Sequence, residues 1–153
     1  MNSPDSLWIS YAKTIIHVMP PGEPVLRISP APLGEVGEWP PMFKAPIFVI
    51  TAWNPASERL RESANRERQE ALDAELRQLT LELWPAVGLD PDSSYREEGV
   101  AVSGLTKEQA ITLGARHGQN AIFAWTPTAW RTLSCIDERR HEAGWRLGRK
   151  IAT

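Results

Sequence analysis

The chain has 153 residues, of which 42% are hydrophobic and 24% charged, with a formal net charge of −2 and a pI near 5.9. This composition is that of a soluble globular protein. It provides no strong field for nucleic acid or an anionic membrane, so we expect neither as a partner. The single cysteine, Cys135, excludes an intramolecular disulfide and fits a reducing compartment. We expect one cytoplasmic domain spanning residues 1–153.

The first pattern predicts a β-hairpin at a sheet edge. Residues 14–19 and 25–28 are short β-rich runs on either side of a Pro/Gly turn. Residues 29–46 then form a long Pro-rich loop without apolar periodicity. Trp39 and Phe43 could anchor this loop as a cover over the sheet, and the alternative is a mobile loop.

The organising stretch of the sequence is the run Ile47–Trp53, which ends at Asn54-Pro55. A continuous β-branched and apolar run is typical of a strand that is buried on both faces. The residue before proline is pushed away from the α region, and Asn favours turns. The chain therefore leaves the sheet at Asn54.

The longest helical pattern follows, and we predict a helix over residues 63–84 that Pro85 ends. Its inward face alternates spacings of four and three residues. That face consists of Asn65, Gln69, Leu72, Leu76, Leu79 and Leu83. The two amides at its start indicate that the core gives way there to a polar pocket. Alternatively, they only satisfy backbone groups of the loop.

The rest of the chain predicts a strand, a short helix, a hairpin and a tail. The second half of residues 95–103 reads as a strand, and Thr106 and Gln109 form a capping box that starts a short helix ending at Gly118. Residues 120–125 and 129–135 form a second hairpin around Pro127. We read the tail, residues 137–153, as a solvated helix or a frayed end.

These elements predict an α+β fold. The sheet is mostly antiparallel with about six strands, in the order β-β-β-α-β-α-β-β, and two helices pack on one face to give a two-layer sandwich. A ferredoxin-like core with an added hairpin is one specific version.

The familiar motifs of catalysis are absent from the sequence. No glycine-rich phosphate loop follows the organising strand, and no nucleophile elbow occurs. The histidines and Cys135 lack the spacing of a metal site. We therefore expect no cofactor and no metal.

The remaining candidates are polar residues at the ends of elements. We expect them to form a ligand-binding site that consists of Thr51, Trp53, Asn54, Asn65, Gln69, Glu97 and Gln119. Amides recognise hydrogen-bonding edges well but are poor acids and bases, so this set favours binding over catalysis. Glu97 and Glu98 are the candidate proton-transfer groups, and as strand neighbours only one of them can enter the site.

The motifs Thr51-Ala52-Trp53-Asn54-Pro55, Arg96-Glu97-Glu98 and Gly118-Gln119-Asn120-Ala121-Ile122-Phe123, with Asn65 before the leucine-patterned helix, resemble a known family. It is the domain-of-unknown-function family 3293 of small bacterial proteins. The resemblance supports the element order and implies no activity or catalytic residue. It marks Thr51, Asn54, Asn65, Glu97 and Gln119 as the matching polar positions. Where this chain has Tyr95-Arg96-Glu97, members of that family often carry Trp-x-Glu.

Three functions remain open at this stage. The first is a non-catalytic binding domain for a small polar or nucleotide-like ligand. The second is a protein-interaction module that uses the sheet face and its tryptophans, including Trp130. The third is an enzyme that uses Glu97 or Glu98 as an acid–base group.

Overall fold

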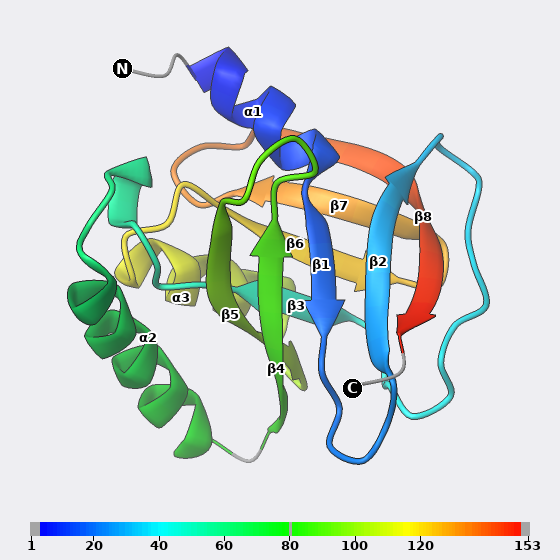
Figure 1. The fold of residues 1–153 in the computed structure, drawn as a ribbon, viewed down its shortest axis with the longest axis horizontal. Helices are drawn as coiled ribbons and strands as arrows, with labels where there is room; N and C mark the ends of the chain where they lie inside the picture. The colour runs from blue at the N-terminus through cyan, green and yellow to red at the C-terminus, as the bar shows by residue number, and fades with distance from the viewer. Residues whose placement is uncertain (1–3, 80, 151–153) are drawn as a thin grey trace.

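The computed structural model describes residues 4–79 and 81–150, which form a closed antiparallel barrel (Figure 1). The strands are β1 (Ile15–Val18), β2 (Val25–Ala31), β3 (Ile47–Ile50), β4 (Glu82–Leu89), β5 (Arg96–Ser103), β6 (Ala121–Thr126), β7 (Ala129–Ser134) and β8 (Arg140–Lys150). Around the barrel they follow the order β1-β2-β8-β7-β6-β3-β5-β4. The helices are α1 (Pro4–Lys13), α2 (Glu62–Arg77) and α3 (Lys107–Arg116), with a single 3-10 turn, η1 (Pro55–Ser57).

The predicted two-layer sandwich of about six strands is wrong, because the sheet closes on itself. The closing contact is between β1 and β4, which pair antiparallel from Ile15↔Leu89 to Val18↔Ala86. The predicted sheet had no β4, so its first hairpin was placed at an edge. In the barrel β1 has a neighbour on each side, and this edge does not exist.

The predicted helix, residues 63–84, overlaps the start of β4. The helix α2 ends at Arg77, and Leu83 belongs to β4. Leu79 and Leu83 continue the spacing of the helical stripe by coincidence, but Leu79 is 48% exposed. Pro85 does not stop a helix; it lies within β4, where its carbonyl accepts the Met19 backbone N–H at 2.9 Å. A proline can occupy a strand where one ladder bond is dispensable.

The tail is likewise a strand over residues 140–150, and not a solvated helix or frayed end; residues 151–153 lie outside the described part. β8 pairs with β2 on one side and β7 on the other. Its inward residues include Ala143 and Trp145, which alternate with Glu142, Gly144 and Arg146. In the sequence, the many charged residues of this segment obscure the alternation of inward and outward residues that is typical of a strand.

Elements with strong local signals are confirmed. Both predicted hairpins form, as β1–β2 and β6–β7. The Thr106 hydroxyl accepts the Gln109 backbone N–H at 3.1 Å, and the Gln109 side chain accepts the Thr106 N–H at 2.8 Å. All four residues of β3 are buried, as predicted for a strand covered on both faces.

The core has two parts, one inside the barrel and one outside it. The outer part lies where α2 and α3 pack leucines such as Leu72, Leu76 and Leu113 against β3, β5 and β6. The inner part is aromatic: Trp125 contacts Trp145 edge to face, with ring centroids 5.3 Å apart. Most of the chain's seven tryptophans therefore fill the barrel and do not form a surface.

The two barrel ends are closed differently. At the end where β4 begins, Phe43 packs on Trp84 and Trp125, and Trp39 packs on Trp125. This part of the long loop is the packed cover, the first of the two alternatives for residues 29–46. The opposite end is crossed by α1, which the sequence did not predict (Figure 1).

Candidate functional site

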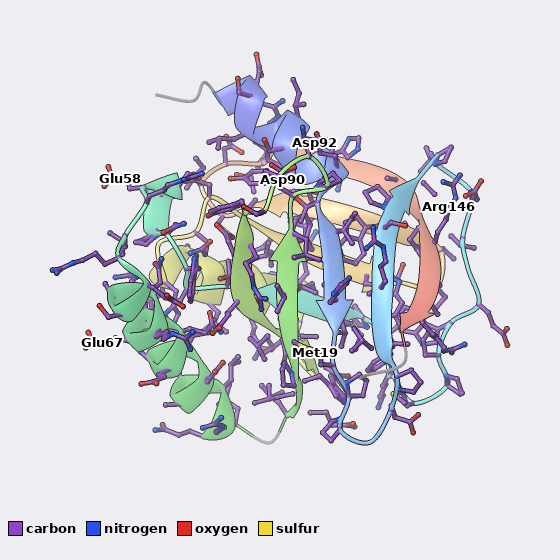
Figure 2. All side chains as sticks on the ribbon, in the orientation of Figure 1. Met19, Glu58, Glu67, Asp90, Asp92 and Arg146 are labelled. Atoms are coloured by element: carbon purple, nitrogen blue, oxygen red, sulfur yellow. The ribbon has the colours of Figure 1, made fainter. Side chains whose placement is uncertain are left out.

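A pocket of about 300 Å³ occupies the barrel end beneath α1. Asp90 and Asp92 mark this end in Figure 2, in the turn that follows β4, whereas Met19 lies toward the other end. The floor comes from inward-facing strand residues, the roof from α1, and the rim from the loops after β3 and β4. The lining includes Leu7, Tyr11, Ile16, Val49, Thr51, Asn54, Ser57, Arg59, Gly88, Asp90, Tyr95, Glu97, Gln119, Asn120 and Phe123.

The centre of the pocket is a short chain of hydrogen bonds. The Asn54 Nδ2 donates to the Tyr95 Oη at 2.5 Å, and the Tyr95 hydroxyl donates to the Glu97 Oε1. Tyr95 and Glu97 are two residues apart on one extended segment, so their side chains share a face. Glu97 pairs with Gly88 of β4, which leaves room above its carboxyl group.

The environment of Glu97 disfavours its charged form. Burial raises the pKa of Glu97, and the hydrogen bond from Tyr95 opposes this only in part. No cation among the described residues forms an ion pair with it. Tyr95 has its pKa raised as well, by burial and by Glu97, so its hydroxyl remains a donor at neutral pH.

Glu98 points the other way, as strand alternation requires. Its carboxylate lies 3.7 Å from Arg66 of α2, outside the barrel. Of the two candidate acid–base residues, the structure therefore places only Glu97 in the pocket.

Asn65 and Gln69 do not line this pocket. Asn65 accepts the Asn54 backbone N–H and donates to the Asn54 Oδ1, both at 2.8 Å. Gln69 accepts the Ala52 N–H at 3.0 Å and lines a separate groove between α2 and β4–β5. These amides satisfy loop backbone groups, which is the second of the two alternatives for them.

The loop that these amides hold has unusual backbone conformations. Asn54, Ala56 and Ser57 all have positive φ, at 46°, 54° and 63°. Asn tolerates this region, but Ala and Ser rarely adopt it. The Ala56 N–H donates to the Gly118 carbonyl at 2.6 Å, which holds the loop against the end of α3. Strained backbone of this kind concentrates at functional sites.

The remaining predicted residues divide in the same way. Thr51 and Gln119 line the pocket, and the Gln119 Nε2 donates to the Trp53 carbonyl at 3.2 Å. Trp53 itself is buried beside the pocket and does not line it. The structure thus brings Thr51, Asn54, Glu97 and Gln119 together and leaves Trp53, Asn65 and Gln69 behind them.

The sequence reasoning missed several lining residues. Tyr95 could have been found, because it lies two residues before Glu97 on the same face. Tyr11 could not, because it reaches the pocket only through α1; burial raises its pKa as well. Arg59, with its Cζ 5.0 Å from the centre of the Tyr95 ring, and Asp90 come from loops without a recognisable pattern.

Two further features concern possible ions and membranes. Within residues 4–79 and 81–150, no group of three or more His, Cys, Asp or Glu side chains is arranged to hold a metal ion. No helix in this part of the chain has the length and apolar character needed to cross a membrane.

The comparison with protein-family models agrees with the resemblance drawn from the motifs. The model of the family "Protein of unknown function (DUF3293)" matches residues 50–122. The matched region contains Thr51, Asn54, Tyr95, Glu97 and Gln119 of the pocket, but not α1. Comparison with curated proteins and with solved structures gave no significant match.

Proposed function

We propose that this chain, whose match supports its assignment to the family of proteins of unknown function DUF3293, binds a small ligand in the pocket beneath α1. The observation that carries the proposal is a partly buried carboxyl group, Glu97, that faces an open volume of about 300 Å³. Pockets of about 300–1,000 Å³ with few polar groups among apolar walls are the usual form of small-molecule sites.

The walls provide both kinds of contact that such a ligand needs. Phe123, Val49 and Ile16 form an apolar side, and Phe123 is held in place by stacking on Trp130 at 5.3 Å. Thr51, Asn54 and Gln119 form the polar side, and their hydrogen bonds fix their orientation. A polar ligand with an apolar body fits this arrangement better than a nucleotide, because the pocket offers no cluster of cations for phosphates.

The protein-interaction alternative has less support. Trp130 and Trp125 are almost fully buried inside the barrel, so they do not form the surface that this alternative requires. An interaction through other surfaces stays a separate prediction.

One observation favours a second candidate, an enzyme with Glu97 as its general acid or base. A carboxyl group whose pKa is raised by burial and that is oriented by a tyrosine is suited to proton transfer. Conversion of a bound compound by the wild type, abolished in Glu97→Gln while binding persists, would favour this candidate.

The binding proposal is tested by filling the pocket. Gly88 lines the pocket, and an added Cβ there would meet Ile16, Thr14 and the Glu97 carbonyl oxygen at 3.6 Å, 3.8 Å and 4.0 Å, which are ordinary van der Waals distances. We expect Gly88→Val to fold and to lose binding of small molecules found by ligand-observed NMR with the wild type. Gly148→Val is the matched control, because its Cβ would meet Arg27 on β2, away from the pocket. Equal binding by both variants, or no ligand for the wild type, would refute the proposal.

A further inference from the structure

Around Glu97 and Gln119, the hydrogen-bonding capacity that remains is that of an acceptor. The inner donors are used within the protein: Asn54 donates to Tyr95, Tyr95 to Glu97, and the Thr51 hydroxyl to the Glu98 carbonyl at 2.5 Å. Among the described residues, nothing donates to the Glu97 Oε2. Gln119 uses its amide N–H groups on the Trp53 and His117 carbonyls, which leaves its own oxygen as an acceptor. A ligand that satisfies these groups must bring donors.

The charges around Glu97 point to a cation. From the loops, Asp90 adds a negative charge at the rim, and hydrogen bonds from the Asp92 N–H and Ser93 hold the pKa of Asp90 low. Arg59 is the one cation among the lining residues, and its guanidinium lies over the Tyr95 ring rather than against the carboxylate. Tyr11 of α1 and Tyr95, which directly precedes β5, remain neutral because their pKa values are raised.

We propose that the ligand carries a primary amine or a similar cationic N–H donor, which pairs with Glu97, on a small apolar body that packs against Phe123. This inference rests on the proposed binding function and narrows it to one chemical class. An amine of this kind supplies both the missing donor and the missing countercharge, and a buried carboxylate is stable only when it is paired and hydrogen-bonded.

The pairing has a consequence for the pH dependence of binding. The amine binds the ionised carboxylate, and burial raises the pKa of Glu97 in the empty pocket. Affinity should therefore rise with pH as Glu97 loses its proton, and it should fall again only when the amine itself deprotonates. Asp90, with its lowered pKa, stays charged and both tyrosines, with raised pKa values, stay neutral over the interval from about pH 5 to about pH 8, so they do not produce this change.

The test uses four compounds of similar size on the full chain: benzylamine, benzamidine, benzyl alcohol and benzoate. Amide shifts in ¹⁵N–¹H spectra locate binding, and titrations give Kd. We expect the two cations to shift residues around Glu97 and to bind at least roughly tenfold more weakly to Glu97→Gln. Glu98→Gln is the matched control, because the same change one residue away lies outside the barrel beside Arg66.

The outcomes separate this inference from the proposed function. If benzyl alcohol or benzoate occupies the pocket as tightly as the cations, the inference of a cationic ligand is wrong, whereas the proposed binding function stands. If none of the four compounds shifts the pocket residues, both fail. The wild type gives a second measurement that does not depend on the folding of any variant. Its benzylamine affinity should rise between about pH 5 and about pH 8 while that for benzyl alcohol stays constant, and a flat benzylamine profile would overturn the pairing.

Discussion

Asn65 and Asn54 hold each other across the loop that joins β3 to α2. The Asn65 Nδ2 donates to the Asn54 Oδ1, and the Asn65 Oδ1 accepts the Asn54 backbone N–H, each at 2.8 Å. Both residues are buried, at 2% and 6% exposure. Asn65 thereby fixes the position from which Asn54 reaches Tyr95, so a residue outside the pocket determines the geometry inside it.

Asn65→Ala should destabilise the protein by about 2–4 kcal/mol, because it leaves the Asn54 backbone N–H and the Asn54 side-chain Oδ1 buried with fewer partners. Chemical denaturation followed by circular dichroism measures the change. Glu67→Ala, on the outer face of α2, is the control and should stay within about 0.5 kcal/mol of the wild type (Figure 2). A variant at residue 65 as stable as this control would show that the amide pair does not hold the loop.

The same substitution at two threonines should have opposite effects. The Thr132 hydroxyl is buried on the inner face of β7 and has no hydrogen-bond partner among the described residues. Thr132→Val keeps the shape and removes this cost, so we expect a gain of about 1 kcal/mol. The Thr51 hydroxyl donates to the Glu98 carbonyl and accepts the Trp53 N–H, so Thr51→Val should lose about 1–3 kcal/mol. Two changes of the same sign in thermal denaturation would contradict this account.

The parts of the fold that the sequence predicted are those specified by neighbouring residues. Thr106 and Gln109 form a capping box within four residues, and the two hairpins turn within a few residues of their strands. Barrel closure is different, because it depends on the pairing of β1 with β4, about seventy residues apart in the chain. Leu83 fitted the helical period as well as the strand, and only that distant partner decides between them.

The sequence likewise predicted one part of the pocket, the residues around β3, but not the part that depends on barrel closure. Thr51, Asn54, Glu97 and Gln119 lie at the ends of elements around β3, and a single antiparallel sheet is enough to bring them together. The roof of the pocket could not be predicted, because Tyr11 meets the others only when β1 closes the barrel and carries α1 across its end.

Replacing Ala56 by glycine should stabilise the protein. Its φ of 54° places an L-residue in the left-handed region, which costs about 1–2 kcal/mol for a residue with a Cβ. Ala56→Gly should therefore gain roughly 1 kcal/mol after the larger entropy loss of glycine. Ala71→Gly in the exposed middle of α2 is the matched control and should lose about 1 kcal/mol. Destabilisation by both substitutions, measured by urea unfolding, would mean that residue 56 carries no such strain.

Glu97 should make the protein less stable as the pH rises. Burial raises its pKa in the folded state above its ordinary value of 4.5, so the folded state holds the proton more tightly than the unfolded state. Its contribution is most favourable below the unfolded pKa and is lost as the pH rises through the folded pKa. Asp73, whose pKa burial also raises, acts in the same direction, so the informative quantity is the difference between wild type and Glu97→Gln.

We expect that difference in the free energy of unfolding, measured by urea titration from about pH 4 to about pH 8, to grow in favour of Glu97→Gln as the pH increases. Glu67→Gln removes an exposed carboxylate and should instead follow the wild type at every pH. Parallel curves of stability against pH for wild type and Glu97→Gln would mean that the carboxyl group is solvated and that burial does not raise its pKa. A benzylamine-saturated sample offers an internal check: pairing with the ligand should cancel the loss of stability in the wild type, because the bound cation stabilises the same ionised form that burial alone disfavours.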